Sequence, residues 1–447
     1  MPLLDALQEK LSDALLPLAA TTLTRRDAVL PAVPGKAHAV IGMRRAGKTC
    51  FLRQLLAERR KSGPPERSIY LSFDDDRLAG IDASHLDALL EEYFRRHPEI
   101  RGKDGRKGRA AWFLDEIQLV EGWDRFVRRV LDTESIDIVV SGSSARMLSR
   151  EIHSSLRGRA MPTVIAPFSF REALRHRGEE PTVRADRLTA AVRSAVEKRL
   201  REYLVVGGFP EAQGSGKRPL DRATRIALLQ GYIDTVLFRD VIERHAVSQV
   251  AALRWIIRHA LRNPCGSLSA NKLHDDLRSQ GHNVARDTVH ALLDHLIDAF
   301  VIAAVPVATD SERRRNTNPR KVYPADPGLI DAFDTSGRSN TGHALETAVY
   351  NELSRRGAEV AYVKTKDGFE VDFLARHPDG RQELIQVCAD GSDPATWSRE
   401  TRALDAGGDE HPKAERVVIV LDPGLVRSMT HRKTRVIAAH QWLLASP

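Results

Sequence analysis

Short apolar runs and longer amphipathic stretches follow one another along the first third of the chain. Residues 3 to 18 have the periodicity of an amphipathic helix, and helical periodicity returns at Phe51 to Arg60 and at His85 to Arg95. The apolar runs between these stretches are Ala37 to Ile41, Ser68 to Phe73, Ala110 to Leu114, Ile136 to Val140 and Pro162 to Ala166. Strands that alternate with helices are typical of a parallel sheet with crossover helices. The pattern therefore predicts an α/β fold for this part of the chain.

The pattern changes near residue 174. From Leu174 to Arg262 it is mainly helical, and it is interrupted by YLVVGGFPEA (Tyr203 to Ala212), which we expect to form a loop. From Ser267 to Val307, apolar residues at core-like spacings predict two helices separated by a turn at Gly281 and then a strand. The turn ATDSERRRNTNPRK and the run KVYP would complete a hairpin. This order is typical of a winged helix-turn-helix.

Basic residues gather where such a module would meet a ligand. Arg286 lies near the start of the second helix, and the predicted hairpin tip holds Arg313, Arg314, Arg315, Arg320 and Lys321. Cations in this arrangement can contact a phosphate backbone. Winged helices also bind proteins, and the second helix is not itself strongly basic. Double-stranded DNA and a protein are therefore both candidate partners.

Composition excludes several classes of protein. The 447 residues include 68 Lys and Arg against 60 Asp and Glu, a net charge of +8, and 42% of them are hydrophobic, so collagen, coiled coil and wholesale disorder are excluded. The length argues for several domains. The chain has no apolar run long enough to span a membrane, so we expect no membrane partner and a cytoplasmic protein. Cys50, Cys265 and Cys388 lie far apart, which does not indicate a disulfide framework or a thiolate zinc site.

A phosphate-binding motif follows the first predicted strand. Gly42 to Thr49 read GMRRAGKT, a full match to G-x-x-x-x-G-K-[ST]. Because a strand precedes the motif and a helix follows it, its amides and the helix N-terminus would wrap the phosphates. Lys48 would hold the β and γ phosphates, and Thr49 would hold Mg²⁺. The residues expected around the nucleotide are Gly42, Met43, Arg44, Arg45, Ala46, Gly47, Lys48, Thr49 and Cys50.

Two carboxylates end the strand in WFLDEIQ. Asp115 would reach Mg²⁺ together with Thr49, and Glu116 would polarise the attacking water. Ser141, at the end of the next strand, could sense the γ phosphate or cap a helix, as could Ser143 and Ser144. The guanine-reading motif Asn-Lys-x-Asp does not occur in the sequence, which favours ATP over GTP.

A pair of arginines follows in LRGRA. Arg157 or Arg159 could deliver positive charge to the transferring phosphate, in cis or from a neighbouring subunit. An arginine supplied in trans would favour a homo-oligomer.

Taken together, the motifs resemble one large prokaryotic family. GMRRAGKT, WFLDEIQLVEGWDRFVRRVLD, SGSSARML, LRGRA, APFSFREAL, YLVVGGFPEA and KVYPADPGL are similar to those of AAA-type ATPases that carry a C-terminal domain of long uncharacterised role. The resemblance extends along nearly the whole chain. It implies an ATPase of the additional-strand-catalytic-glutamate class, then a winged helix, then a small α/β restriction-endonuclease-like domain, and it favours Arg159 over Arg157 as the γ-phosphate contact.

The expected domains follow from this resemblance and the change of pattern. They are a helical lead (1–30), the AAA-type ATPase core (31–173), a helical lid or connector (174–262), a winged helix with a basic wing (263–326) and a restriction-endonuclease-like domain (327–447).

The last domain carries part of a nuclease motif. Glu346 on a predicted helix and Asp372 on a predicted strand match acids that gather Mg²⁺ and activate water in that fold. Gln386 and Cys388 stand where an active member would have Glu and Lys. Glu383 is no substitute, because side chains alternate across a strand and it points away from them. We therefore favour a catalytically degenerate fold retained for binding or assembly.

The sequence thus predicts an ATP-hydrolysing, Mg²⁺-dependent protein whose nucleotide state is coupled to a C-terminal half that binds DNA or a partner. An ATP-regulated nuclease is one alternative. The other is a signalling or scaffold protein that uses ATP as a conformational switch.

Overall fold

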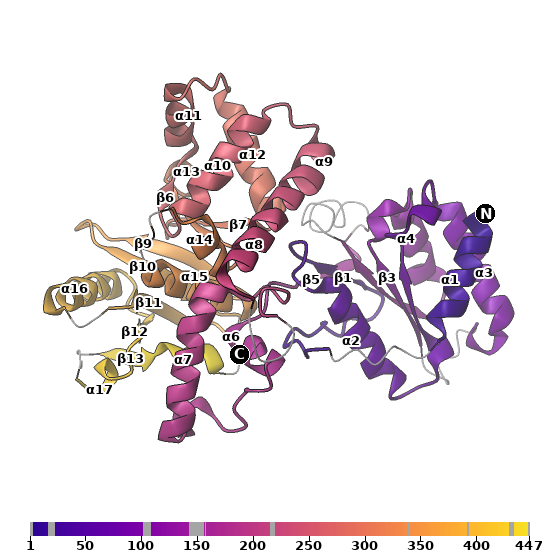
Figure 1. Ribbon diagram of the computed structural model, residues 1–447, viewed down its shortest axis with the longest axis horizontal. Helices are drawn as coiled ribbons and strands as arrows, with labels where there is room; N and C mark the ends of the chain where they lie inside the picture. The colour runs from indigo at the N-terminus through magenta and orange to yellow at the C-terminus, as the bar shows by residue number, and fades with distance from the viewer. Residues whose placement is uncertain are drawn as a thin grey trace. The chain divides into compact units, whose positions relative to one another are not determined.

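The computed structural model describes residues 3–16, 23–101, 109–142, 156, 158–214, 220–335, 337, 340–390, 393–428 and 433–445. Ser143, Ser144 and Arg157 lie outside the described residues. The chain forms two compact units, Met1–Ala166 and Pro167–Pro447 (Figure 1). The boundary between the units therefore falls before residue 173, where the change of pattern suggested it.

A parallel five-stranded sheet forms the centre of the first unit. The strands are β1 Ala37–Ile41, β2 Ser68–Ser72, β3 Ala110–Asp115, β4 Ile136–Ser141 and β5 Ala160–Val164. They lie in the order β2-β3-β4-β1-β5, and all neighbours are parallel. The strand β4 thus lies between β1 and β3. The sheet confirms the predicted α/β fold and its five apolar runs, although β5 begins before Pro162. Proline is tolerated there because β5 is an edge strand.

Helices cover both faces of this sheet. They are α1 Leu3–Ala14, α2 Lys48–Arg60, α3 Ala83–Arg96 and α4 Trp123–Thr133, with 3₁₀ turns at Pro65–Arg67, Asp76–Leu78, Pro98–Ile100 and Ile117–Leu119. Successive residues of β3 point to opposite faces. Phe113 belongs to the core with Phe51 and Leu52 of α2. On the other face, the ring centroid of Trp112 lies 5.3 Å from that of Tyr93 of α3.

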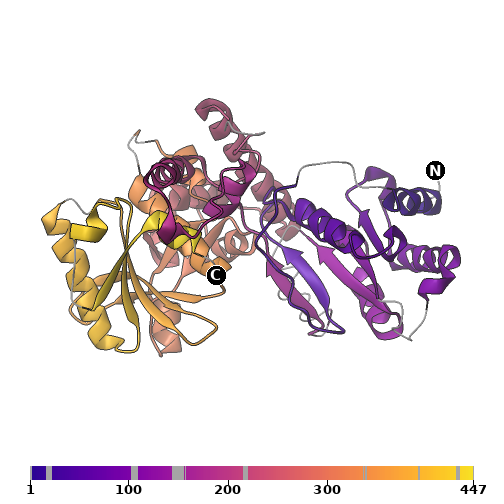
Figure 2. The ribbon, with the colours of Figure 1, turned by 90° about the horizontal axis from the view of Figure 1, so that it is seen from below.

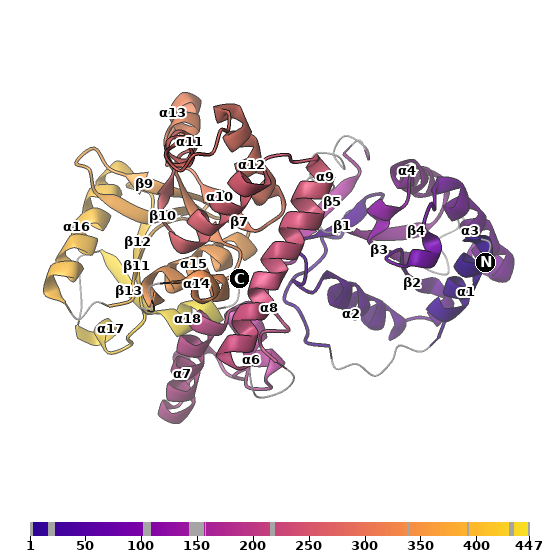
Figure 3. The same ribbon diagram turned by 45° about the horizontal axis from the view of Figure 1, so that its top comes forward.

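The second unit begins with helices. These are α6 Phe170–His176, α7 Ala190–Val206, α8 Arg222–Val236, the π-helical segment η6 Leu237–Ile242, α9 Glu243–His245 and α10 Val250–Arg262, with a 3₁₀ turn at Ala185–Arg187. Figure 3 shows α8 and α9 as nearly continuous. Tyr203 to Val206 end helix α7, so the loop predicted from Tyr203 begins only at Gly207. Four apolar residues without a breaker extend the helix, and glycine stops it.

A small antiparallel sheet follows these helices. Its strands β6 Ser267–Leu268, β7 Ile302–Val305 and β8 Arg320–Pro324 lie in the order β6-β8-β7. Helices α11 Ala270–Ser279 and α12 Arg286–Asp298 separate β6 from β7, and α13 Glu312–Thr317 lies between β7 and β8. The predicted hairpin tip is therefore a short helix. Ser311 caps its N-terminus, because the Ser311 side chain accepts a hydrogen bond from the backbone amide of Arg314.

The chain ends in a mixed sheet in the order β13-β12-β11-β10-β9. Its elements are α14 Gly328–Phe333, α15 Thr341–Arg355, β9 Glu359–Lys364, β10 Glu370–Arg376, β11 Gln382–Cys388, α16 Pro394–Glu410, β12 Glu415–Val420, α17 Leu425–Ser428, β13 Thr434–Ala438 and α18 Ala439–Leu444. Strands β9, β10 and β11 pair antiparallel, whereas β11, β12 and β13 pair parallel. Helices α15 and α16 lie on opposite faces of the sheet (Figures 1 and 2).

One hydrophobic core joins the segments of the second unit. It includes Phe168 and Leu200 from the first helices, Tyr323 from β8, and Leu345 and Trp442 from the last part of the chain. The three segments expected as separate domains after residue 173 are therefore grouped in one compact unit.

Two of the sequence motifs meet in a buried clasp within this unit. Asp326, from KVYPADPGL, accepts hydrogen bonds from the amides of Gly208 (2.6 Å) and Gly328 (2.9 Å). A Cβ on Gly207, which has φ +80°, would lie 1.7 Å from Asp326 Oδ1. Gly207 is thus required by the close approach of this carboxylate, whereas a Cβ on Gly208 would lie 2.1 Å from the carbonyl oxygen of Phe168.

Candidate nucleotide-binding site

The phosphate loop connects β1 to α2 and leaves the helix N-terminus uncapped. Gly42 has φ +144°, and a Cβ there would lie 2.2 Å from the carbonyl oxygen of Ile165. Gly47, the N-cap of α2, has φ +99° and makes no side-chain cap. Arg45 also has a left-handed backbone, with φ +65°. The first amides of α2 can therefore hydrogen-bond an anion.

The loop side chains divide by burial. Met43 and Ala46 are buried, so they can contribute only backbone groups to a nucleotide, whereas Arg45 and Cys50 are exposed and Arg44 is half-buried. The Lys48 amine donates to the carbonyls of Gly42 (3.0 Å) and Met43 (3.1 Å). It thus lies against the loop that would hold the phosphates.

Asp115 is held by hydroxyl groups from three elements. Its Oδ2 accepts from Thr49 at 2.8 Å and from Tyr70 at 2.6 Å, and its Oδ1 accepts from the hydroxyl of Ser141. Asp115 is 2% exposed. Strand β3 presents Asp115 at its carboxyl end, beside the ends of β2 and β4, because the neighbouring strands are parallel.

Glu116 follows Asp115 at a strained position. Its backbone is left-handed, with φ +54°, and its amide donates to Ser141 Oγ at 3.2 Å. The Glu116 carboxylate accepts a hydrogen bond from the side-chain amide of Gln118. Burial raises the pKa of the Glu116 carboxyl, while the nearby Lys48 and Gln118 oppose that rise. A raised pKa suits a group that takes a proton from water.

The residues present fit a magnesium ion. Mg²⁺ prefers oxygen ligands at a phosphate site and retains several waters. The Thr49 hydroxyl and the Asp115 carboxylate provide two oxygens 2.8 Å apart beside the loop. The structure thus brings together Lys48, Thr49, Asp115, Glu116 and Ser141, which were predicted from separate segments.

Arg159 does not join this group. It lies just before β5, and its carbonyl accepts from the amide of Ala37, the first residue of β1. The phosphate loop begins after Ile41, the last residue of β1, which is about 16 Å along the strand from Ala37. The side chain instead forms an ion pair with Asp132 of α4. A role in cis is therefore wrong for Arg159, because the register of β5 fixes it at the opposite end of the sheet from the phosphate loop.

Sequence reasoning missed three residues that shape the site. Tyr70 donates to Asp115, and Gln118 donates to Glu116. Arg26 is 6% exposed and donates to the carbonyls of Ala46 (2.9 Å) and Ala166 (2.5 Å). Arg26 precedes the motif by a long segment, and Tyr70 lies within an apolar strand, so neither carries a local signal.

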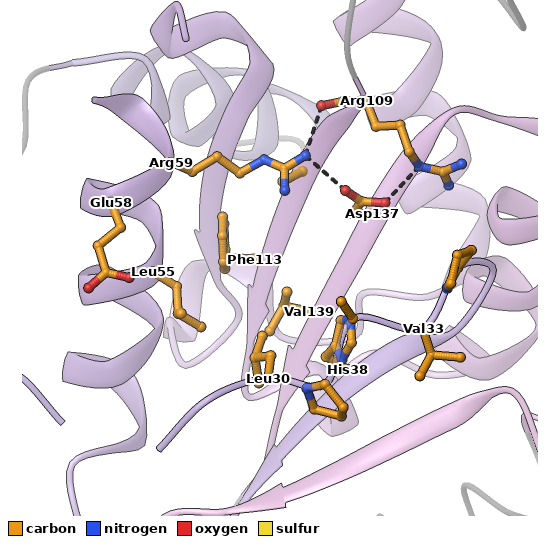
Figure 4. Close-up of a pocket in the computed structure, with 14 residues that line it drawn as sticks. Leu30, Val33, His38, Leu55, Glu58, Arg59, Arg109, Phe113, Asp137 and Val139 are labelled. Atoms are coloured by element: carbon orange, nitrogen blue, oxygen red, sulfur yellow. Dashed lines mark hydrogen bonds and ion pairs between the residues drawn. The ribbon is translucent and has the colours of Figure 1, made fainter. Parts of the chain in front are cut away.

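A cavity of about 520 Å³ in the same unit lies elsewhere (Figure 4). It opens near the amino ends of the strands, where His38 is the second residue of β1 and Asp137 is the second residue of β4. Asp137 pairs with Arg59 at 2.8 Å and with Arg109 at 2.7 Å. Because the phosphate loop follows the carboxyl end of β1, this cavity is not the nucleotide site.

The acids of the second unit surround a lysine. Lys321 Nζ lies 2.8 Å from Glu370, 3.2 Å from Asp372 and 3.4 Å from Glu346. Lys321 is 4% exposed, so it cannot contact a DNA backbone as predicted for the hairpin tip. Strand β8 is buried on both faces from Lys321 to Pro324, so Lys321 lies inside the fold. We call Glu346, Glu370, Asp372 and Lys321 the acidic site.

Gln386 and Cys388 do not add ligands to this site. The Gln386 side chain accepts from the amide of Asp372 (3.3 Å) and donates to Glu400 (2.5 Å). Cys388 packs in a hydrophobic core, and burial raises the pKa of its thiol to about 11. Glu383 bonds His377 at 2.7 Å and pairs with two arginines, away from Asp372.

The other predicted DNA contacts differ in exposure. Arg286, Arg313 and Arg314 are exposed, and Arg320 is half-buried. Arg315 pairs with Glu359 of β9 at 2.8 Å. Three exposed cations thus remain as candidates on α12 and α13.

Across the part of the chain that the structure describes, helices long and apolar enough to cross a membrane are absent.

Comparisons with known proteins agree with the first unit and leave the second open. Residues 34–174 match the family model described as AAA domain, and residues 197–340 match a domain of unknown function, DUF8612. The chain is 16% identical to the Walker-type ATPase PABY2304 of Pyrococcus abyssi, covering 74% of this chain and 95% of that one at a TM-score of 0.42. For the ORC2 protein of Aeropyrum pernix the identity is 16%, the coverage 74% and 92%, and the TM-score 0.37.

Two relatives match over most of their length. The uncharacterized protein MJ1544 of Methanocaldococcus jannaschii is 33% identical over 368 residues, which cover 81% of this chain and 77% of that protein. An uncharacterized protein of Haemophilus influenzae is 28% identical, covering 78% of this chain and 80% of its own. The chain therefore belongs to the family of MJ1544, and its first unit is an AAA-type domain of the nucleotide-binding P-loop class.

Proposed function

We propose that the protein hydrolyses ATP with Mg²⁺ and couples its nucleotide state to DNA binding by the second unit. The observation that carries the first part is the cluster of Thr49, Asp115, Glu116 and Ser141 at an uncapped helix N-terminus. Hydroxyl, carboxylate and amide groups converge there, which is what phosphoryl transfer requires.

Each residue has a role in this proposal. The amides of the loop and the Lys48 ammonium bind the phosphates, and Thr49 and Asp115 hold the metal, which neutralises phosphate charge when bound. Ser141 fixes Asp115 and the amide of Glu116. The Glu116 carboxylate orients a water and takes its proton. In this arrangement Arg159 acts only in trans, which implies a homo-oligomer.

The test of this part is ATP binding and turnover in Lys48→Ala. Loss of the ammonium removes a contact to the β and γ phosphates, so we expect weaker binding and a loss of turnover. Lys61→Ala is the matched control, because it removes the same charge from an exposed position at the C-cap of α2. Unchanged ATP affinity in Lys48→Ala would contradict the site.

We propose further that residues 263–326 form a winged helix that contacts double-stranded DNA. The support is the order of α11, α12, β7 and β8 around a small antiparallel sheet. Ser269 caps α11 by accepting from the amide of Lys272 at 3.2 Å. Arg286 at the start of α12 and Arg313 and Arg314 on α13 are the cations that would reach phosphates.

DNA binding is tested by removing charge. The double variant Arg313→Ala with Arg314→Ala should weaken binding of duplex DNA and flatten its dependence on salt. Lys198→Ala with Arg201→Ala is the control, because it removes two exposed charges from α7. If both double variants bound duplex DNA equally well, the proposed DNA contact through Arg313 and Arg314 would be wrong. ATP turnover that DNA does not change would favour a protein-directed switch.

We also propose that residues 327–447 form a restriction-endonuclease-like domain without nuclease activity, kept for binding or assembly. The support is the mixed sheet flanked by α15 and α16, together with an amide and a thiol at Gln386 and Cys388. Cleavage of plasmid DNA with Mg²⁺ or Mn²⁺ that is lost in Asp372→Ala would establish the rival nuclease instead.

A further inference from the structure

The acidic site holds a buried lysine that comes from a different sheet. Lys321 belongs to β8 of the three-stranded sheet, whereas Glu370 and Asp372 belong to β10 and Glu346 belongs to α15. Its ammonium lies within 3.4 Å of an oxygen of each acid. Lysine side chains are seldom buried without partners. Here the carboxylates are those partners.

Other groups of the chain bind oxygens of the same acids. Asp372 Oδ2 accepts from the amide of Val387 at 3.0 Å, while its Oδ1 faces Lys321. Glu346 Oε1 accepts from the hydroxyl of Tyr323 at 2.8 Å, and Tyr323 also belongs to β8. The acids are thus bonded by donors from β8 and β11.

A divalent cation does not fit this arrangement. Mg²⁺ and Mn²⁺ need several oxygen ligands around one point. At that point the structure has an ammonium, whose charge would repel a dication at the distances given. The metal that a nuclease fold implies is therefore incompatible with Lys321 in place.

We propose that the Lys321 ammonium takes the place of a divalent cation in the acidic site and thereby fastens the three-stranded sheet to the five-stranded sheet. The proposal does not depend on ATP hydrolysis. The strand that carries Lys321 follows α13, so the same contact anchors the segment that we propose to meet DNA. The electrostatics agree, because Asp372, Glu346 and Glu370 raise the pKa of Lys321 against the effect of burial.

The proposal is tested with Lys321→Met, which keeps the length of the side chain and removes its charge. Thermal unfolding is measured with and without millimolar Mn²⁺, in the absence of nucleotide. All chains carry Asp115→Asn, so that the phosphate loop does not contribute a metal site. Lys198→Met is the matched control, because Lys198 is exposed on α7.

We expect Lys321→Met to unfold about 5 to 10 °C lower than its parent. Mn²⁺ should recover a large part of this loss, because the freed carboxylates can then bind the ion. The parent chain and Lys198→Met should not respond to Mn²⁺. Stabilisation of the parent by Mn²⁺, lost in Asp372→Asn, would overturn the proposal, since lysine and metal would then bind together.

A second variant covers the case in which Lys321→Met does not fold. Lys321→Met combined with Glu346→Gln and Glu370→Gln leaves one carboxyl group where there were three. We expect this variant to fold and to ignore Mn²⁺. If it is as unstable as Lys321→Met, packing rather than charge explains the lysine, and the proposal is wrong.

Discussion

Asp115 at the end of β3 in the first unit and Asp372 within β10 in the second are both buried carboxylates, but their partners differ in charge. Asp115 accepts from the hydroxyls of Thr49, Ser141 and Tyr70. Asp372 accepts from the Lys321 ammonium and a backbone amide. Hydroxyl donors orient a carboxylate without cancelling its charge, whereas an ammonium neutralises it. In our proposals the first site therefore takes an external cation, whereas the second contains its own.

The largest effect should come from Glu116→Gln, which tests whether the first site is catalytic. Removing a general base should lower turnover by about 10² to 10⁴-fold while ATP binding is retained. Steady-state hydrolysis and nucleotide titration measure the two separately. Glu121→Gln is the control, because it makes the same change at an exposed position nearby. Undiminished hydrolysis in Glu116→Gln would remove the assignment of the base.

A matched pair of variants tests the comparison directly. Asp115→Asn should lower ATP turnover strongly and raise the Mg²⁺ concentration needed for half-maximal turnover, because one of the two proposed metal ligands is lost. Asp372→Asn should leave turnover unchanged and destabilise the fold by about 1 to 3 kcal/mol, because the amide group would face the Val387 N–H donor. Hydrolysis assays and denaturant unfolding give the two readouts. The comparison fails if the two variants change the same property.

The pH dependence of unfolding sharpens the account of the acidic site. Burial, followed by the charge of Asp372, raises the pKa of Glu346 to about 8 from its ordinary value of 4.5. The folded state then binds a proton that the unfolded state releases, so this contribution to stability is present below pH 4.5 and is lost as the pH rises through 8. Glu346→Gln should flatten that fall in denaturant unfolding curves. A slope equal to that of the unsubstituted chain would show that Glu346 is already ionised in the fold.

Tyr70→Phe should have the smallest effect. The variant removes one of three hydroxyl donors to Asp115, which is worth about 0.5 to 1.5 kcal/mol. Burial and Asp115 raise the pKa of Tyr70, so the hydroxyl remains a donor across the neutral range. We expect a modest change in the Mg²⁺ concentration needed for half-maximal turnover. A loss as large as that in Asp115→Asn would mean that Tyr70 contacts the nucleotide or metal itself.

The nucleotide site could largely be predicted from the sequence because its parts carry local signals. Spacing defines the loop from Gly42 to Thr49, and the two acids follow an apolar strand. Parallel pairing then brings the ends of β1, β3 and β4 to one edge. The sequence left open whether Arg159 acts in cis or from a neighbouring subunit, because only the register of β5 reveals which end of the sheet it occupies.

The acidic site could be predicted only in part. Glu346 and Asp372 were found by their motif, but Lys321 was counted with the exposed cations of the hairpin. Nothing local distinguishes it from Arg320, its neighbour in the chain. The packing of β8 beside β10 and α15 decides that Lys321 is buried and that Arg320 is not.

The sequence by itself determined the α/β order of the first unit, the phosphate loop and the residues at its strand ends, because these depend on periodicity and short-range spacing. Only the tertiary structure decided the single core of the second unit, the clasp between Gly208 and Asp326, and the partner of each buried charge. The physical reason is that a buried charge is stabilised by whichever group lies within a few ångströms of it, and the fold brings that group from a distant part of the chain.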